Sequence, residues 1–403
     1  MRPFTHTIPI DEARRRLAAE ARPLDRTEVV PLADLSGRVI AAPLTAPGDV
    51  PPFARAMMDG YAVRASDTAG ATRDTPVVLA VVGKVFTGEI FTGPELGAGQ
   101  CVEIATGAPM PDGATAVVMV EESAPAPGGA VQVRTSVFDG QHVGRAGADI
   151  ARGTAVLRPG DMLLPARVGA VAAVGASQAH VFARPRVAIV STGNEVVAPG
   201  QALRAGQIHD VNKHTLAAIV AAHGGVPVLF DVAGDTIDAL DATLTETLGC
   251  DLVLLSGGSS VGARDLVMDV LAGRGRVVFH GIATRPGKPT AFGVVDDVPV
   301  FGMPGNPASC LTNAYVLLVP FLRTLAHLPP HQPRRVAAPL ARRVTSSVGR
   351  HQFYTVRLVD GRAEPAFKAS GDITSLAHAD GYIEIDADVA AVEAGTVVDV
   401  VLF

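Results

Sequence analysis

The stretch LLSGGSSVGARD, residues 254–265, decides the fold that the sequence predicts. An apolar run stops at Ser256, small residues with glycine at 257, 258 and 262 follow, and Asp265 stands ahead of LVMDVL. A buried strand that passes through a glycine-rich turn into a helix is the repeating unit of a parallel sheet. Backbone N–H groups in such a turn can cradle an anion. The alternative is a plain tight turn in which Asp265 caps the helix.

The same alternation extends over residues 186–328. Strand-like runs such as RVAIVST, VPVLFDV and VVFHGIA are separated by helix-like runs such as NKHTLAAIVAAHGG and IDALDATLTETLG. The segment AFGVVDDVPVFGMPG adds an expected hairpin through Asp296 and Asp297. This pattern predicts a doubly wound α/β domain, with a parallel-rich sheet covered by helices on both faces.

The flanking segments differ in character and predict further domains. Residues 51–145 show short strands broken by Gly and Pro, which is typical of a small β-rich domain. We expect it to be inserted into a discontinuous N-terminal helical and extended domain, residues 1–50 plus 146–184. The α/β domain would then occupy residues 185–328. Short β runs over residues 329–403 predict a small C-terminal β-barrel.

Composition bounds the class of protein. Of the 403 residues, 48% are hydrophobic and 18% charged, which excludes a disordered chain. A net charge of -6 and the absence of Trp argue against a nucleic-acid partner. The three cysteines are far apart, as expected for reduced thiols. With no apolar leader and no convincing membrane span, we expect a cytoplasmic protein with no membrane partner.

Three loops should meet at one edge of the α/β sheet, because ligands bind beyond the carboxyl ends of parallel strands. These loops are STGNEV (191–196), SGGSSVGARD (256–265) and GMPGNPAS (302–309). The segment TRPGKPTAF (284–292) adds Arg285 and Lys288 near the same edge, and two cations beside anion cradles suit a phosphate. The alternative for this segment is a solvated loop.

Three acids also follow strands of this sheet: Glu195, Asp235 and Asp265. Carboxylates beside phosphate cradles suit Mg²⁺, although each acid alone could be a surface or capping residue. Two further stretches, ARAMMDGYAVR (54–64) around Asp59 and ATGAPMPDGATAVV (105–118) around Thr106, are explained by turns on the residues alone. No motif supports covalent catalysis or a Cys/His zinc site.

The ordered set of motifs resembles a known family. PPFARAMMDGYAVR, ATGAPMPDGATAVV, GRAGADIARG, STGNEV, LLSGGSSVGARD, TRPGKPTAFG and GMPGNPAS occur here in the order found in molybdopterin molybdenumtransferases and the gephyrin E domain. The resemblance runs from about residue 10 to the C-terminus. It implies molybdenum cofactor biosynthesis: Mg²⁺-assisted hydrolysis of adenylylated molybdopterin, release of AMP, and insertion of molybdenum from molybdate.

The resemblance also implies a set of site residues. The catalytic residues would be Asp59, Thr106, Asp149, Glu195, Asp235 and Asp265, of which Glu195, Asp235 and Asp265 would hold the metal. The cofactor-binding residues would be Gly257, Gly258, Ser260, Gly262, Arg285, Lys288, Pro304, Gly305, Asn306, Pro307, Ser309, Arg350 and Ser370. The last two come from GRHQF and SGDITSL, where the match is weakest. Departures from the family pattern fall at Ala54, Asn194 and Arg285.

Partners follow from the same resemblance. Family members are homodimers of four-domain chains whose cleft is shared, so Asp59 and Thr106 would come from the partner chain and the N-terminal domain would serve dimerisation. The upstream molybdopterin adenylyltransferase is an expected partner. The alternatives are a tungstate-handling paralogue and a non-catalytic scaffold. A stand-alone adenylyltransferase is disfavoured because it needs only the α/β domain.

Overall fold

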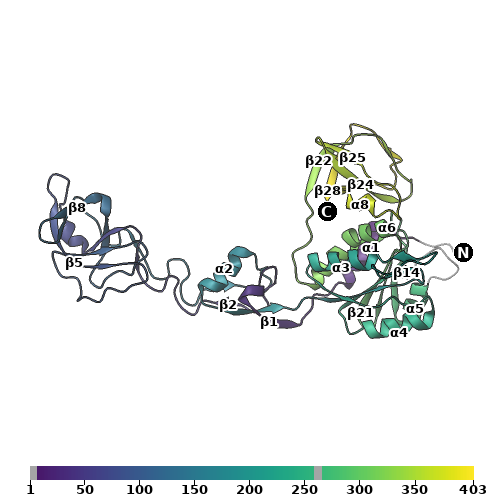
Figure 1. The fold of residues 1–403 in the computed structure, drawn as a ribbon, viewed down its shortest axis with the longest axis horizontal. Coiled ribbons are helices and arrows are strands. Elements are labelled where there is room, and N and C mark those ends of the chain that lie inside the picture. Colours follow the sequence, from purple (N-terminus) through teal and green to yellow (C-terminus); the bar gives the residue numbers. More distant parts are fainter. Residues whose placement is uncertain (1–6, 258–265) are drawn as a thin grey trace. The chain divides into compact units, whose positions relative to one another are not determined.

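The structure, a computed structural model, describes residues 7–257 and 266–403 (Figure 1). The chain divides into two compact units. One comprises Met1–Glu28, Gly37–Val39 and Val181–Phe403, and the other comprises Val29–Ser36 and Ile40–His180. The larger unit holds the α/β sheet together with the C-terminal sheet.

The α/β sheet is mixed. Its described strands follow the order β16-β13-β17-β21-β20-β18. The first four strands are parallel, and β20 pairs antiparallel with both β21 and β18. Asp296 and Asp297, both at positive φ, make the tight β20–β21 turn. The bounds are β13 (Arg186–Ser191), β16 (Val226–Leu229), β17 (Leu252–Ser256), β18 (Arg276–His280), β20 (Ala291–Val295) and β21 (Val298–Met303).

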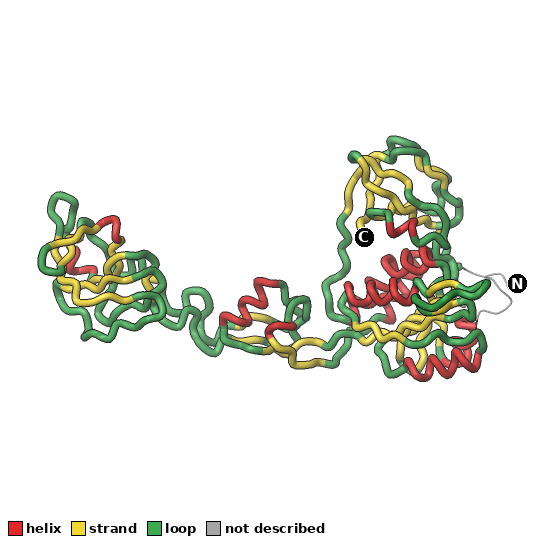
Figure 2. The backbone as a smooth tube through the Cα atoms, in the orientation of Figure 1, coloured by secondary structure: helices red, strands yellow, loops and turns green. Residues whose placement is uncertain are grey.

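Helices cover both faces of this sheet (Figure 2). Along β13, Val187 and Ile189 enter one apolar core while Ala188 and Val190 enter the other, as the two-residue repeat of a strand requires. The first core also takes residues from α1 (Ile10–Glu20), α3 (Asn212–Ala222), α6 (Pro307–Asn313), the π-turn η4 (Ala314–Leu318) and α7 (Val319–Leu325). The second takes residues from α4 (Ile237–Thr247) and α5 (Leu266–Arg274).

The helical run Pro307–Leu325 is long and apolar enough to cross a membrane by length and composition alone. However, 72% of its most apolar window is buried within the protein. Its side chains belong to the larger core of the α/β sheet. The core helix of a soluble protein has these same properties, so its hydropathy carries no membrane assignment.

The C-terminal sheet follows the order β19-β24-β26-β28-β22, with β25 also paired to β24. A bridge between Leu340 and Ala363 links the segments after β22 and within β25, so the sheet curls into a half-barrel. The bounds are β19 (Thr284–Arg285), β22 (Arg335–Pro339), β24 (His351–Val359), β25 (Arg362–Pro365), β26 (Gly381–Ile385) and β28 (Val397–Leu402). Beside it lie the short pair β23 (Val344–Thr345) and β27 (Ala391–Val392), and helix α8 (Thr374–Ala377).

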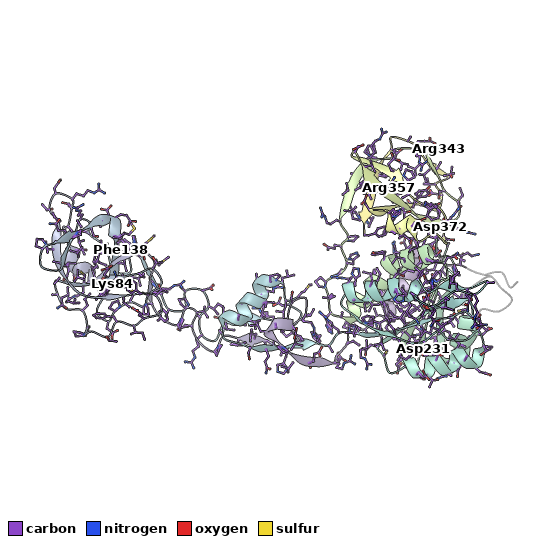
Figure 3. All side chains as sticks on the ribbon, in the orientation of Figure 1. Lys84, Phe138, Asp231, Arg343, Arg357 and Asp372 are labelled. Atoms are coloured by element: carbon purple, nitrogen blue, oxygen red, sulfur yellow. The ribbon has the colours of Figure 1, made fainter. Side chains whose placement is uncertain are left out.

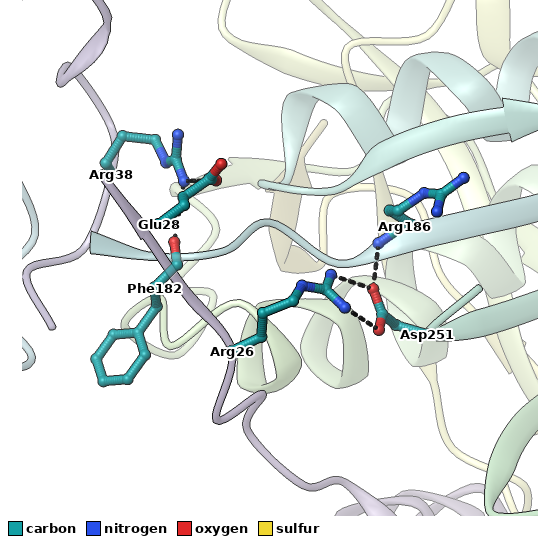
Figure 4. Close-up of polar contacts among 6 residues, drawn as sticks. All are labelled: Arg26, Glu28, Arg38, Phe182, Arg186 and Asp251. Atoms are coloured by element: carbon teal, nitrogen blue, oxygen red, sulfur yellow. Dashed lines mark hydrogen bonds and ion pairs between the residues drawn. The ribbon is translucent and has the colours of Figure 1, made fainter. Parts of the chain in front are cut away.

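Ion pairs fix the N-terminal segment of the larger unit (Figure 4). Both guanidinium nitrogens of Arg26 donate to the carboxylate of Asp251, at 3.1 and 2.9 Å, and this carboxylate also accepts the N–H of Arg186 at 2.7 Å. Arg38 is buried and donates to Glu28 and to the carbonyl of Phe182. The segment around Arg26 is therefore tied to the start of β13.

The smaller unit carries a sheet in the order β7-β4-β6-β5-β9-β8. Its bounds are β4 (Gly60–Val63), β5 (Val77–Val85), β6 (Gln100–Ile104), β7 (Ala116–Met119), β8 (Ser123–Ala126) and β9 (Ala130–Val133). Gly128 and Gly129, both at positive φ, form the β8–β9 turn. Helix α2 (Pro165–Ala173) and the short pairs β2 (Leu44–Thr45) with β11 (Ala155–Leu157) and β3 (Arg55–Ala56) with β10 (Val143–Gly144) lie outside this sheet.

Candidate functional site

A cavity of about 1010 Å³ lies at the carboxyl edge of the α/β sheet. Ser191, Ser256 and Met303 are in register at the ends of β13, β17 and β21, so three loops leave the sheet side by side. The lining includes Ser191, Thr192, Glu195, Val196, Ile208, His209, Asp210, Asn212, Ser256, Gly257, Arg285, Gly287, Lys288, Pro304, Gly305, Asn306, Pro307, Ser309, Arg350, Phe367, Lys368 and Ser370. This volume is at the upper end of the roughly 300–1,000 Å³ of small-molecule sites.

Close backbone approach explains a glycine at the cavity floor. Gly257 has φ +105°, and a Cβ there would lie 2.3 Å from the carbonyl oxygen of Thr192. The N–H of Thr192 donates to the carbonyl of Ser256 at 2.8 Å. A larger residue at 257 would separate the two loops, so this glycine sets the shape of the site.

The side chain of Asn212 links two of the loops that line the cavity. Its Nδ2 donates to Ser256 Oγ at 2.8 Å and to the carbonyl of Gly305 at 2.8 Å. Asn212 is the first residue of α3 and is only 8% exposed. One buried amide thus fixes the end of β17 to the loop that precedes α6.

Asp210 is a buried carboxylate in the cavity wall, only 5% exposed. Its Oδ1 accepts the N–H of Lys213 at 3.0 Å, and its Oδ2 lies 3.6 Å from Lys213 Nζ. Asp210 follows the short strand β15 (Ile208–His209), which pairs with β14 (Val196–Val197) after Glu195. This parallel two-stranded ribbon therefore brings Glu195 and Asp210 to the same cavity.

The basic loop, residues 284–290, is anchored by a second buried amide. Asn313 is fully buried, and its Nδ2 donates to the carbonyl of Gly287 at 2.8 Å and to Thr290 Oγ1 at 2.6 Å. Gly287 has φ +98°, and a Cβ there would lie 2.3 Å from Asn313 Nδ2. The loop that carries Arg285 and Lys288 is thereby fixed against helix α6.

The same loop is also a strand of the C-terminal sheet. β19 pairs parallel with β24, with Thr284 opposite His351 and Arg285 opposite Gln352. The guanidinium of Arg285 donates to Ser347 Oγ at 2.5 Å. Arg350, directly before β24, lines the cavity. The C-terminal sheet and the α/β sheet therefore share one wall of the site.

The loop 366–373 closes the cavity from the C-terminal sheet; Asp372 of this loop is labelled in Figure 3. Asn306 Nδ2 donates to Ser370 Oγ at 3.0 Å, and the N–H of Ala308 donates to the carbonyl of Ser370 at 3.1 Å. Phe367, Lys368 and Ser370 face the cavity.

The lining is locally positive although the chain has a net charge of -6. Among the described residues it holds four cationic side chains, Arg285, Lys288, Arg350 and Lys368, against the two acids Glu195 and Asp210. Cations with backbone N–H groups and small hydroxyl residues suit an anionic ligand with several oxygens. Cys310, behind Ser256, is not a nucleophile, because burial raises the pKa of its thiol to about 12.

Comparisons with known proteins place the chain in a family. Residues 8–175 match the MoeA N-terminal region (domain I and II), residues 188–324 a probable molybdopterin binding domain, and residues 337–403 the MoeA C-terminal region (domain IV). Molybdopterin molybdenumtransferase 2 of Mycobacterium tuberculosis is 37% identical over 401 residues, covering 96% of this chain and 97% of that protein.

The chain belongs to the molybdopterin molybdenumtransferase family.

Other family members support the same assignment. The molybdopterin molybdenumtransferase of Bacillus subtilis is 30% identical over 410 residues, with 98% of this chain and 94% of that protein covered. The solved structure of the molybdopterin biosynthesis moeA protein from Pyrococcus horikosii has a TM-score of 0.86 at 38% identity, with 98% and 99% coverage. The resemblance read from the motifs is thus confirmed, and the chain is an enzyme of the transferase class.

The structure brings many of the expected molybdopterin molybdenumtransferase residues together. The cavity lining contains Glu195, Gly257, Arg285, Lys288, Pro304, Gly305, Asn306, Pro307, Ser309, Arg350 and Ser370. Gly258, Ser260, Gly262 and Asp265 lie outside the described residues. Asp235 is not part of the described lining. Its Oδ2 instead accepts the N–H of Asn194 at 3.3 Å, so it supports the loop that carries Glu195.

The remaining expected residues lie in the smaller unit. Asp59 Oδ1 accepts the N–H of Thr106 at 2.7 Å, and the carbonyl of Thr106 accepts the hydroxyl of Thr87 at 2.6 Å. Gly107 follows at φ +85°. The hydrogen bond between Thr106 and Asp59 joins the loop before β4, which carries Asp59, to the loop after β6, which carries Thr106. Asp149 lies at a separate hollow of about 520 Å³ beside helix α2.

The expected magnesium ion would need oxygen ligands, some of them from side chains. Within residues 7–257 and 266–403, no three His, Cys, Asp or Glu side chains are grouped so that they could hold a metal ion. Glu195 and Asp210 are the two acids in the described lining. The described carboxylates alone therefore do not make a complete metal site.

Sequence reasoning missed Asp210, Asn212, Phe367 and Lys368. For Asp210 a signal existed, because an Asp three residues before Lys213 at the start of a helix is a capping pattern. Phe367 and Lys368 follow β25 with no periodic or glycine-rich signal around them. Only the tertiary fold places them at the cavity.

Proposed function

We propose that this protein inserts molybdenum from molybdate into adenylylated molybdopterin, with hydrolysis of the adenylate and release of AMP. Membership of the molybdopterin molybdenumtransferase family supports the reaction class. The observation that carries the proposal is the cationic cavity at the strand ends, large enough for a ligand of nucleotide size or more. A phosphoanhydride and an oxyanion both need such a positive, amide-rich environment.

The residues divide into roles by their charge and place. Arg285, Lys288 and Arg350 would neutralise the phosphates and the oxyanion, since all three line the cavity. Glu195 would orient the water that attacks phosphorus and accept its proton, while the bond to the AMP oxygen breaks and AMP leaves with that electron pair. Asp265 and Asp235 would complete the acidic set. Mg²⁺, when bound, would supply further neutralisation of phosphate charge.

The assembly is also part of the proposal. We propose a cytoplasmic homodimer in which the hydrogen-bonded loops of Asp59 and Thr106 reach the partner's cavity. Both residues are exposed on the smaller unit, which is required of side chains that contact another protomer. Three further points stay predictions. They are the adenylyltransferase partner, the role of Asp149, and the division into domains 1–50 with 146–184, 51–145, 185–328 and 329–403.

The test is AMP release from adenylylated molybdopterin by the purified protein, with Mg²⁺ and either molybdate, tungstate or neither oxyanion. We expect release that depends on molybdate, and E195Q should lower the rate by roughly 100-fold, the usual contribution of a general base. R343A, an exposed arginine outside the cavity, is the control. No release from folded dimeric protein would support a scaffold instead, and release with tungstate alone would support the tungstate-handling paralogue.

A further inference from the structure

One phenyl ring, that of Phe367, stands in the wall of the cavity, which also holds the imidazole of His209. Of the residues described in its lining, Phe367 is the only Phe or Tyr. This is notable in a chain whose aromatic content is 4% and which has no Trp. Phe367 is partly buried and comes from the C-terminal sheet, directly after β25.

The backbone on both sides of Phe367 is fixed. The N–H of Ala366 donates to the carbonyl of Thr355 at 2.9 Å, which ties the residue before it to β24. The N–H of Lys368 donates to the hydroxyl of Ser375 at 3.1 Å, and Ser375 is fully buried. The position of the ring is thus set before any ligand arrives, which lowers the entropic cost of binding.

The ring is also supported from behind. Tyr354 on β24 lies with its ring centroid 5.4 Å from that of Phe367, at an interplanar angle of 48°. This tilted arrangement is favourable for two aromatic rings. Phe367 is therefore in contact with another ring of the protein, while the residue still lines the cavity.

We infer that Phe367 is a specificity-determining residue on which a flat heteroaromatic ring of the substrate packs. The inference rests on the proposed function, because adenylylated molybdopterin carries two such rings, a pterin and an adenine. Anionic groups of the same molecule would meet Arg350 and Lys368, which line the same cavity beside Phe367. A rigid aromatic face selects planar heterocycles over simple anions such as inorganic phosphate.

The experiment compares three ligands: a pterin monophosphate, AMP and inorganic phosphate. Each is titrated into wild-type protein and into F367A, F367L and F367Y. Pterin fluorescence can be followed without tryptophan background, because the chain has no Trp. Calorimetry reports AMP and phosphate. F138A, which removes an exposed Phe of the smaller unit (Figure 3), is the matched control, and thermal unfolding checks that every variant folds.

We expect F367A and F367L to weaken binding of at least one heterocycle by about tenfold, the size of typical aromatic–base stacking. F367Y should restore that binding, and phosphate binding should not change. Loss confined to the pterin phosphate would assign the ring to the pterin, and loss confined to AMP would assign it to the adenine. Should both heterocycles bind F367A or F367L within twofold of wild type, the inference is overturned. An equal loss of phosphate binding would also overturn it, since the loop itself would then be disturbed.

The two proposals fail in different ways. A wild-type protein that binds the heterocycles through Phe367 but releases no AMP would contradict the proposed function and leave this inference standing. If the wild-type protein releases AMP with molybdate, and the residue 367 variants bind every ligand as tightly as the wild type, this inference alone is contradicted.

Discussion

The floor and the rim of the cavity are built from different kinds of group. We use "floor" for the buried lining residues Ser191, Thr192, Asn212, Ser256 and Gly287, and "rim" for the exposed residues Glu195, Arg285, Arg350 and Lys368. The five floor residues are neutral and hydrogen-bonded backbone to backbone or through amides, whereas the rim is charged and solvated. Asp210, a buried carboxylate of the wall, belongs to neither group. The floor therefore sets the shape of the site, and the rim sets its charge.

This difference predicts that substitutions in the floor lower the free energy of unfolding, whereas substitutions in the rim weaken substrate binding. The largest expected effect is that of G287A. Its Cβ would lie 2.3 Å from the side chain of buried Asn313, at φ +98°. Overpacking and backbone strain together should lower the free energy of unfolding by roughly 3 kcal/mol. Urea unfolding measures this.

The control for G287A is G349A. Gly349 also has positive φ, +87°, but a Cβ there would meet nothing within 4 Å. It should lose only the strain of the left-handed conformation, about 1 kcal/mol. Equal losses in the two variants would contradict the close packing of the basic loop against Asn313.

The next effect is that of N212L, which removes the donors to Ser256 Oγ and the carbonyl of Gly305. Loss of these hydrogen bonds, one of them to buried Ser256, costs about 1–3 kcal/mol. Because two loops lose their link, kcat/KM for AMP release should also fall, by about tenfold. Unfolding and steady-state kinetics together test this. A variant with wild-type kinetics would show that Asn212 supports the fold without shaping the site.

Sequence reasoning found the three strand-end loops for a physical reason. Hydrophobic periodicity locates strands, and parallel strands bring their carboxyl ends to one edge, so STGNEV, SGG and GMPGNP were expected to meet. The order of the strands within the sheet depends on contacts between distant segments, and hydrophobic periodicity does not predict it. Asp235 follows β16, which is the edge strand. Its loop pairs with Thr192 and its carboxylate supports Asn194, so it borders the cavity from the outside without being part of the described lining.

The same limit explains the residues that were missed. Asp210 follows a two-residue strand, too short to show any repeat. The pairing of Arg285 with Gln352 joins positions 67 residues apart, and the place of Phe367 depends on that pairing. The cations of TRPGKP were identified by their charge, but the strand that fixes them came only from the structure.

A smaller effect on the fold is expected at the rim. R350A should leave the free energy of unfolding within about 0.5 kcal/mol of wild type, since an exposed side chain packs little. It should raise KM for the anionic substrate by about tenfold, the value of one charge-assisted contact. R343A is the matched control, because Arg343 is an exposed arginine of the same C-terminal region that pairs with exposed Glu393 and is not part of the described cavity lining (Figure 3). Equal KM changes in the two variants would mean that general surface charge is responsible.

The smallest effect is a pH dependence at Glu384, on β26. The hydrogen bond from His351 lowers the pKa of its carboxyl below 4.5, and the charge of Arg14 lowers it further. A lowered pKa stabilises the fold above the unfolded value, and this contribution is lost as pH falls through the folded value. The free energy of unfolding should therefore drop below pH 4.5 in the wild type, and less in E384Q. Parallel pH profiles would contradict this assignment.

The pairing of β19 with β24 has a consequence for how such a chain can be cut or recombined. A fragment that ends before residue 335 would leave β19 without its partner, and a C-terminal fragment alone would expose the edge of β24 where His351 and Gln352 pair. Exposed strand edges invite association between molecules. A chimaera that takes this C-terminal sheet from a homologue should fold only when residues 284 and 285 come from the same homologue. The two distant segments therefore have to be exchanged together.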